Sequence, residues 1–465
     1  MRTNSKLFFR DQLYGNKPSI KYERFIFLSL LLLPINCFYF GSMNEMLFEL
    51  GLYPYLIISP LIGVLLLERY YHNSFIVKLL LFFLYWALIS GVANIIGIYH
   101  SANYSDVGLY RYFKQMLEIT VGIFLVLFIS TVIVKREITI ERISEFVIYS
   151  IKACVFVGVI EIMGKIVGIS VFLEVFNLIS HLVNRNPYIP GRIHTLSGEP
   201  SWYGIYTAFA YPFLLHMLLK HGKHKILFLL FLVTIYYTTS RTMYVVVLLQ
   251  SLVFFPTIFK QVMSRRLIPV TMFLIAMSLW IGYNNQSAVS TAMESVTETI
   301  SSITDFTMES DESYSSTARL GMQMTAVNMG LAHPFFGVGE GQFIFNFASY
   351  IPEWTTGSYE IEKAELGGTA QVHGMYARIF AELGVVGLLI WLSIWALSVI
   401  RLVNAKKDAT NNEKKEINLL LCLIVGVFAC GFNVDSFRMM VVWITFGIIA
   451  GWYLKYERRI NHISE

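Results

Sequence analysis

The chain has 465 residues, of which 55% are hydrophobic and only 14% are charged. Soluble domains carry about 25% charged residues, and a mean hydropathy of +0.58 leaves too few polar side chains to cover a soluble surface. This composition excludes a soluble enzyme, a disordered chain, a coiled coil and a secreted disulfide scaffold. The net charge of +5 is spread along the chain and gives no ground for binding nucleic acid. The sequence therefore predicts an all-α, polytopic integral membrane protein.

Twelve apolar runs approach the length needed to cross a hydrocarbon layer about 30 Å thick. They lie at residues 25–41, 52–67, 75–98, 115–134, 146–168, 201–219, 225–240, 242–259, 267–283, 374–400, 417–433 and 438–454. Lys and Arg residues collect in alternate connections, a bias that marks the cytosolic side. Both termini are therefore expected in the cytosol. The four cysteines fall inside apolar stretches and predict neither disulfides nor a metal site.

The charge and hydropathy patterns divide the chain into five segments. They are a basic cytosolic tail at 1–24, spans one to nine at 25–283 with an outer loop at about 169–200, a large outer loop at 284–372, spans ten to twelve at 373–454 and a cytosolic tail at 455–465. The basic start is interpreted as a signal anchor that is kept. The large loop should carry short helices, among them an amphipathic one over 318–332. Keeping two basic clusters on one side requires a tight hairpin at Ser240–Arg241.

Three arginines on the expected outer side indicate a site, because ionisable groups at the membrane are costly. Arg192 follows a Pro-Gly turn at the mouth of a span, and Arg241 lies in a hairpin too short to carry it into water. Arg319 follows Ser316 and Thr317, the expected helix caps, and a cation in that first turn favours a bound anion. A surface ion pair is the alternative for each arginine alone. Three together favour a clamp for phosphate groups.

A histidine at the start of the tenth span is the candidate for proton chemistry. His373 lies at the outer boundary, where an imidazole can donate to a phosphate oxygen or accept a proton near neutral pH. A satisfied structural histidine is the alternative. Glu199 is a candidate base, and further contacts are expected from His333, Tyr203 and Tyr376.

Other charged residues and motifs have simpler interpretations. Lys165 and Arg378 lie near helix ends and are expected to extend their charged groups to the interface. Glu382, four residues after Arg378, is expected to pair with it. The glycines at 337, 339 and 341 lack the strand that a nucleotide-binding loop requires. No metal-ligand spacing and no cofactor motif is present in the sequence.

Four segments carry a family resemblance. They are the Gly-Glu-Pro-Ser core within 192–204, Thr-Ser-Arg at 239–241, the Arg319 helix with His-Pro-Phe-Phe-Gly-Val-Gly at 333–339, and His373 with Glu-Leu-Gly at 382–384. In order and spacing they resemble the O-antigen polymerase and O-antigen ligase family of bacterial polysaccharide assembly, from about residue 185 to 400. The family often has Asn directly after the histidine, whereas this chain has Gly374, so no amide role is assigned to that position.

The resemblance implies an integral-membrane glycosyltransferase of the bacterial inner membrane, acting at the periplasmic face in lipopolysaccharide or similar polysaccharide synthesis. Its donor would be an oligosaccharide on undecaprenyl diphosphate, without a nucleotide sugar, metal or other cofactor. Arg192, Arg241 and Arg319 would bind the diphosphate, and His373 would assist the leaving group or the acceptor hydroxyl, with Glu199 as a base. Partners would be membrane lipids and the lipid-linked oligosaccharide, and the resemblance also points to a chain-length regulator protein.

Three functions remain open from the sequence. A polymerase moves the growing glycan to a new lipid-linked repeat unit and is preferred. A ligase moves the finished chain to the lipid A core and differs only in its acceptor. A lipid-linked oligosaccharide flippase or other transporter would place charges along a path through the midplane, whereas the candidate charges here gather at one face.

Overall fold

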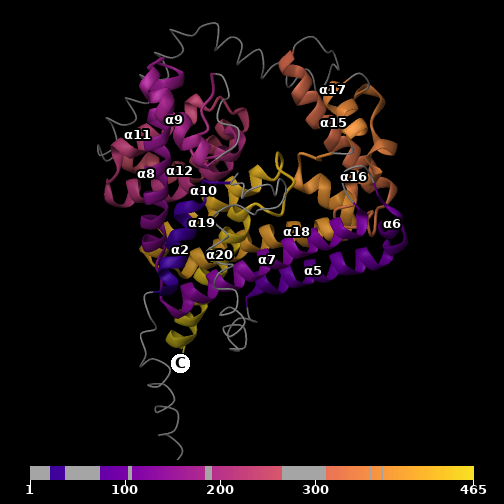
Figure 1. Cartoon of the computed structure of the whole chain (residues 1–465). Helices are drawn as coiled ribbons and strands as arrows, with labels where there is room; N and C mark the ends of the chain where they lie inside the picture. Colours follow the sequence, from indigo (N-terminus) through magenta and orange to yellow (C-terminus); the bar gives the residue numbers. More distant parts are fainter. Residues whose placement is uncertain are drawn as a thin grey trace, which may run out of the picture.

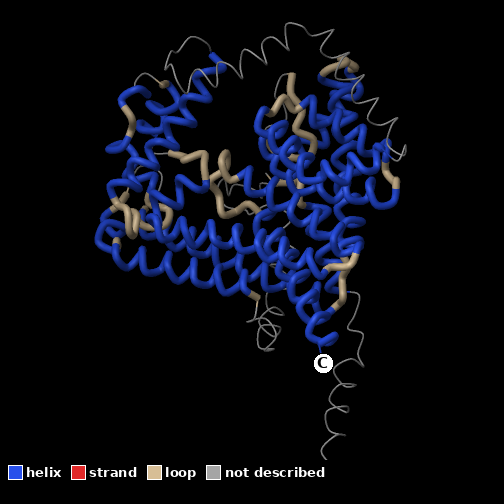
Figure 2. The backbone as a smooth tube through the Cα atoms, turned by 180° about the vertical axis from the view of Figure 1, so that it is seen from behind, coloured by secondary structure: helices blue, strands red, loops and turns tan. Residues whose placement is uncertain are grey.

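The computed structural model describes residues 21–36, 74–102, 107–183, 191–263, 311–355, 358–367 and 370–464. All regular secondary structure in these ranges is helical, as the composition predicts, apart from one isolated β-bridge between Ala102 and Val107. Figure 1 shows two groups of helices joined at their base, with a smaller cluster above one of them. The backbone seen from behind in Figure 2 has the same arrangement.

Four helices in the described ranges are long and apolar enough to cross a membrane by length and composition. They are α5 (Phe75–Ala93), α7 (Gly108–Lys135), α8 (Ile140–Lys165) and α18 (Met375–Asp408). Shorter or more polar helices occupy six further predicted runs: α2 (Lys21–Leu32), α10 (Pro200–His221), α11 (Lys225–Tyr237), α12 (Arg241–Met263), α19 (Asn411–Cys430) and α20 (Met440–Ser464). The predicted spans at 52–67 and 267–283 lie outside the described residues. Helices thus mark ten of the runs, and four of these helices are both long and apolar enough to cross a membrane.

The first group consists of α5, α7, α18 and α20, in which α7 packs mainly against α20 and α5 packs against both α18 and α7. Glycines let α7 and α20 approach closely, because a Cβ built on Gly447 would lie 2.8 Å from the Cβ of Ile129. Small residues serve this purpose where helices pack in a membrane. The indole of Trp443 fills the equivalent space beside Gly122. This close pairing makes α7 and α20 the rigid base of the group.

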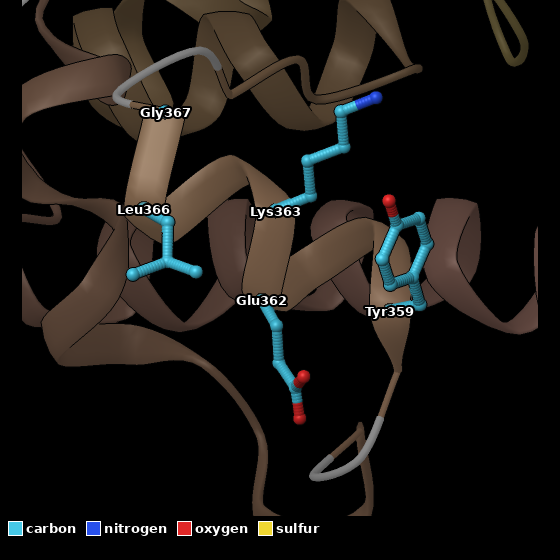
Figure 3. Close-up of a pocket in the computed structure, with 5 residues that line it drawn as sticks. All are labelled: Tyr359, Glu362, Lys363, Leu366 and Gly367. Carbon is cyan, nitrogen blue, oxygen red and sulfur yellow. The ribbon is translucent and has the colours of Figure 1, made fainter.

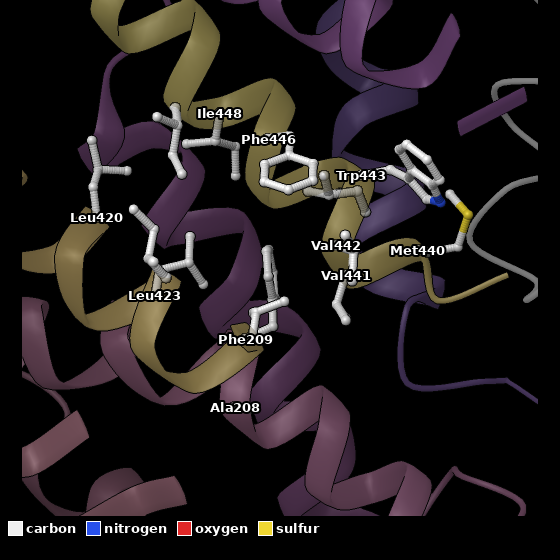
Figure 4. Close-up of a cluster of buried hydrophobic side chains, with 14 of the residues drawn as sticks. Ala208, Phe209, Leu420, Leu423, Met440, Val441, Val442, Trp443, Phe446 and Ile448 are labelled. Carbon is white, nitrogen blue, oxygen red and sulfur yellow. The ribbon is translucent and has the colours of Figure 1, made fainter. Parts of the chain in front are cut away.

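The second group contains α8, α10, α11, α12 and α19, with α2 against α8 and α9 (Ser170–Val183) also on α8. The α9 helix falls within the predicted outer loop at 169–200. The two groups share a core where α10, α19 and α20 meet, and Figure 4 shows Phe209, Leu423 and Phe446 there. These three side chains are almost completely buried. The apolar runs therefore explain both the helices and their packing.

The third cluster is built from the predicted large loop. It contains α15 (Asp311–Ala332), α16 (Phe343–Asn346), the 3₁₀ helices Phe347–Tyr350 and Glu353–Thr355, and α17 (Tyr359–Gly367). Their buried apolar residues form a core of their own, including Met322, Met329 and Phe343. α15 packs against α18. The amphipathic helix was expected to begin near residue 318, but it begins seven residues earlier.

A break in α18 fixes this cluster to the first group. Gly384 has φ +69° inside the helix, a backbone conformation that glycine adopts without a steric cost. The polar backbone groups around the break are satisfied by the loop after α15. Gly339 N–H donates to the carbonyl of Glu382 at 2.9 Å, and Val385 N–H donates to that of Pro334 at 2.8 Å. The predicted His-Pro-Phe-Phe-Gly-Val-Gly segment is thus the connection between the loop cluster and α18.

Candidate functional site

The segment that carries Arg192 lies across the end of α11. Ile193 N–H donates to the carbonyl of Tyr237 at 3.1 Å. Arg192 Nε donates to the carbonyl of Thr238 at 3.0 Å, and the arginine is half-buried. The guanidinium is therefore held against the short connection between α11 and α12.

That connection places the second predicted arginine. α11 ends at Tyr237 and α12 begins at Arg241, so a tight break lies where the charge pattern predicts a hairpin. Thr239 has φ +51°, and Ser240 N–H donates to Thr238 Oγ1 at 3.3 Å. The backbone of Arg241 is described, and its side chain is not. Arg192 is thus bonded to this corner at Thr238, and Arg241 is part of the same corner three residues further along the chain.

The connection between α19 and α20 joins this corner to His373. Asn433 Nδ2 donates to Thr242 Oγ1 in the first turn of α12. Two residues later, Asp435 Oδ2 accepts from the backbone N–H of Val372 at 2.7 Å and from that of His373 at 3.3 Å. These bonds hold His373 at φ +59°, where residues other than glycine are uncommon. Asp435 was not among the predicted site residues.

The α15 helix brings the third arginine to the same place. Gln323 Nε2 donates to the carbonyl of His373 at 2.9 Å and to that of Phe432 at 3.0 Å. Arg319 lies one turn before Gln323, is exposed, and acts electrostatically on His373. The absence of a side chain at Gly374 makes room for this amide, because a Cβ there would lie 3.1 Å from Cδ of Gln323.

The expected position of Arg319 within its helix needs a correction. Because α15 begins at Asp311, Ser316 and Thr317 are internal residues and Arg319 lies in the third turn. The effect of the helix dipole is confined to the first turn. The argument that free N–H groups and Arg319 share one anion is therefore wrong. What supports Arg319 as a site residue is its proximity to His373.

Burial sets the protonation of His373. Burial lowers the pKa of its imidazole below the ordinary value of 6.5, Asp435 raises it, and Arg319 lowers it. The net shift is downward. The ring is therefore neutral near pH 7, and one of its nitrogens can accept a proton. An imidazole in this state suits a proton acceptor better than a fixed positive charge.

The four principal residues are connected by one continuous series of contacts. It runs from Arg192 through the α11–α12 corner, the α19–α20 connection and His373 to Gln323 and Arg319 on α15. The series joins both helix groups and the loop cluster at one end of the helices. Positive charge and a neutral imidazole are thereby collected on connecting segments and on the adjoining helices α12 and α15.

The other candidate residues lie apart from this series or are engaged in packing. Glu199 is exposed immediately before α10 and accepts from Ser201 Oγ at 3.3 Å. Tyr203 is completely buried, and its hydroxyl bonds Thr234 Oγ1 at 2.9 Å. Its contacts are those of a packing residue.

Tyr376 and His333 also have partners within the protein. Tyr376 lies one turn from His373, and its hydroxyl donates to the carbonyl of Phe428 at 2.6 Å. His333 Nε2 bonds the hydroxyl of Tyr350 at 2.9 Å near the end of α15. Of these two, Tyr376 is the closer neighbour of the candidate site.

Two charged residues that were expected to reach the interface are buried instead. The side chain of Lys165 is 1% exposed and bonds Glu161 Oε1 at 2.7 Å. Arg378 is also buried. It pairs with Glu382 at 2.9 Å, as predicted, and also with Glu340 at 2.8 Å. The spacing of four residues could have revealed Lys165 with Glu161, but Glu340 lies too far away in the sequence to be found by any local pattern.

The pocket drawn in Figure 3 lies on a different surface. It is lined by one face of α17, at Tyr359, Glu362, Lys363, Leu366 and Gly367. Tyr359 and Leu366 are 74% and 83% exposed. None of the predicted site residues lines it. The candidate site is therefore defined by the loop contacts described above and not by this pocket.

The fold and site define a helical membrane protein with a cationic site formed by the α11–α12 corner, the start of α18 and α15. Residues 226–392 match a family model described as O-antigen ligase. The resemblance to the O-antigen ligase and polymerase family predicted from the sequence is thereby confirmed. The matched region contains Arg241, Arg319 and His373, whereas Arg192 lies upstream of it. No curated protein matches the chain.

Proposed function

We propose that the protein is a glycosyltransferase that moves a glycan from a lipid diphosphate to an acceptor sugar, acting as a polymerase of surface-polysaccharide repeat units. The observation that carries this proposal is the series of contacts from Arg192 to Arg319. Three cations and a neutral histidine at one end of the helices suit a donor whose leaving group is a diphosphate. The family match over residues 226–392 supports the same class of reaction.

The arginines would act on the charge that develops on the leaving group. As the bond between the anomeric carbon and the diphosphate oxygen breaks, negative charge grows on that oxygen. Fixed cations lower the barrier because they interact more strongly with the transition state than with the bound donor. Arg192, Arg241 and Arg319 have this role in the proposal. Removing one such stabilising group typically costs about 10²–10³ in rate.

His373 would take the proton that the acceptor loses. The acceptor hydroxyl oxygen forms the new bond to the anomeric carbon, and its proton passes to the neutral imidazole. The diphosphate leaves with the electron pair of the broken bond. Glu199 is the second candidate base, and its carboxylate is exposed, so that it can meet an acceptor from solvent. The two bases can be separated by substitution, as described below.

The proposed reaction has an expected location in the cell. The donor would be an oligosaccharide on undecaprenyl diphosphate, and the site would face the periplasm from the bacterial inner membrane, with both termini in the cytosol. This orientation is supported by the sequence, because most of the Lys and Arg residues lie in alternate connections between the apolar runs. The reaction would need neither a metal nor a nucleotide sugar, and a chain-length regulator would be a partner.

The test is glycan transfer by the full-length protein in lipid vesicles. The vesicles contain undecaprenyl-diphosphate-linked repeat units and a chelator, without nucleotide sugar. A ladder of products is expected from the wild type. Arg192→Ala, Arg241→Ala and Arg319→Ala should each lose about 10²–10³ in rate, and His373→Ala should lose more than Glu199→Ala. Arg401→Ala, at the opposite end of α18, should retain the ladder.

A ligase is the second candidate, because the matching family model carries that description. Its reaction uses the same donor and differs in the acceptor. Transfer of a single chain only when the lipid A core is added, with no ladder from repeat units alone, would replace the polymerase by the ligase. Absence of transfer under both conditions would overturn the enzyme and favour a transporter.

A further inference from the structure

A buried carboxylate holds the turn that follows Arg192. Glu161 lies one turn from the end of α8, and its side chain is completely buried. Its Oε2 accepts from the backbone N–H of Thr195 at 2.8 Å and from that of His194 at 3.1 Å. Thr195 has φ +56°, a strained conformation for a branched residue. The two bonds to Glu161 stabilise this turn.

A lysine completes the arrangement and contacts the arginine segment directly. Lys165 Nζ bonds Glu161 Oε1 at 2.7 Å, lies 4.7 Å from the ring centre of Phe176, and donates to the carbonyl oxygen of Arg192 at 3.4 Å. A charge pair this deeply buried is weak evidence of a contribution to stability, because desolvation offsets the attraction between the charges. Two hydrophobic side chains would fill the same space. The presence of the Glu161–Lys165 charge pair is therefore better explained by the backbone segment that it holds.

The pair holds the backbone segment that carries Arg192, one of the three arginines of the proposed clamp. The backbone of residues 192–195 is tied to Glu161 and Lys165 on one side and to the end of α11 on the other, through Ile193 and Tyr237. The guanidinium of Arg192 then reaches the carbonyl of Thr238. Releasing the turn from Glu161 and Lys165 would therefore remove one of the two sides that hold the backbone of Arg192, while the bonds to the end of α11 remain.

We propose that Glu161 and Lys165 are positioning residues that fix Arg192 for the donor diphosphate. This inference rests on the proposed function, since it requires Arg192 to bind the diphosphate. It assigns to α8, which lies outside the region of the family match, a part in the reaction. Neither residue touches the substrate in this proposal, and both act through the backbone of residues 192–195.

The test must separate positioning from a general contribution to stability. In Glu161→Met/Lys165→Met both charges are removed together, so neither remains buried without its partner, and the acceptor for the two N–H groups is lost. Glu161→Gln/Lys165→Gln keeps one carbonyl acceptor at position 161 and serves as the conservative rescue. Glu174→Gln is the matched control, because Glu174 is an exposed carboxylate on the neighbouring α9.

Each variant is combined with Arg192→Ala in a double-mutant cycle. The measurements are kcat and KM for the undecaprenyl-diphosphate-linked donor in vesicles. With Arg192 present, the methionine pair should lower kcat/KM about 10–100-fold. With Ala at position 192 it should change kcat/KM less than about 2-fold, because the group that it positions is already gone. The glutamine pair should recover part of the loss, and Glu174→Gln should have no effect in either background.

Equal losses in both backgrounds would overturn the positioning role while leaving the proposed function in place. An Arg192→Ala variant that transfers glycan at the wild-type rate would overturn the positioning role and would also remove Arg192 from the proposed clamp. No transfer by the wild-type protein would overturn the proposed function itself, and the positioning role with it. If the methionine pair does not fold, the cycle is carried by the glutamine pair, for which a smaller loss confined to the Arg192 background is expected.

Discussion

Two buried charge clusters hold connecting segments in the described part of the chain, and they differ in their balance of charge. On α8, one lysine meets one carboxylate, Lys165 with Glu161. On α18, one guanidinium meets two carboxylates, Arg378 with Glu340 and Glu382. The first cluster is neutral as it stands. The second carries an excess negative charge unless one of its carboxyl groups keeps a proton.

The difference shows how the two loops are held. The α8 cluster holds one short turn, through the backbone N–H groups of residues 194 and 195 and beside the imidazole of His194. The α18 cluster spans three parts of the fold, because Arg378 also donates to Gln115 Oε1 on α7 at 2.9 Å. Burial raises the pKa of Glu340 well above its usual range, and the Glu382 carboxylate raises it further. One network thus contacts a single segment, while the other favours the protonated form of Glu340 and joins the loop cluster to the helices.

The largest effect on stability is expected at the centre of the α18 cluster. Arg378→Met leaves two buried carboxylates without their cation and should cost about 3–5 kcal/mol of unfolding free energy. Chemical unfolding in detergent micelles measures this loss. Arg401→Met on the same helix is the control, because the Arg401 side chain is 40% exposed, and it should cost less than about 1 kcal/mol. Similar losses for the two variants would contradict the account.

The same substitution in the two clusters should have unequal effects. Glu161→Gln leaves Lys165 buried without a full charge partner and should cost about 3 kcal/mol. Glu340→Gln replaces a carboxyl group that favours its neutral form by a neutral amide, while Glu382 still pairs with Arg378, so its cost should stay within about 1 kcal/mol. Both values come from unfolding at pH 7 in the same micelles. The reverse order of stability would show that the charge balance has been assigned wrongly.

The proton on Glu340 predicts a dependence of stability on pH. Because its folded pKa lies above the ordinary value of 4.5, the folded state holds a proton that the unfolded state has released. Its contribution is full below pH 4.5 and is lost as the pH rises toward the folded pKa. The free energy of unfolding is measured between about pH 5 and pH 8, above the ordinary pKa of a carboxyl group. It should fall less steeply with rising pH in Glu340→Gln than in the wild type. An unchanged slope would place the proton elsewhere.

The smallest expected effect is a shift in the pH profile of transfer. Because burial lowers the pKa of His373 below 6.5, the acid limb of the rate should lie below that pH. Arg319 contributes to the lowering, so Arg319→Gln should move the limb upward while reducing the maximal rate. Rates normalised to each variant's own maximum measure the shift. A limb that moves downward would exclude His373 as the titrating group.

The sequence predicts the helices well because membrane burial leaves a long apolar signal, as at α5, α7, α8 and α18. It misplaces the start of α15, since residues 311–317 are polar and acidic and show no apolar period. Local spacing predicts Arg378 with Glu382. It does not reveal Asp435, which reaches His373 from 62 residues away in the sequence.

The residues of the candidate site could likewise be predicted from the sequence, but the contacts that join them could not. Arg192, Arg241, Arg319 and His373 were identified because charged groups on apolar helices and short turns are conspicuous. Their connection depends on Asn433, Gln323 and Asp435, which are ordinary polar residues in sequence. Only the fold shows that these three side chains bond to the backbone or side chains beside the four predicted residues. Charge indicates which residues matter, whereas tertiary contacts decide which of them meet.

Binding of undecaprenyl diphosphate, compared with undecaprenyl monophosphate, tests the central claim most directly. The full-length protein in nanodiscs should bind the diphosphate more tightly, because three arginines can contact two phosphate groups. Arg192→Ala, Arg241→Ala and Arg319→Ala should each reduce that preference, and Arg401→Ala should keep it. Equal affinity for the two lipids, or a preference that survives in all three variants, would contradict a diphosphate clamp at this end of the helices.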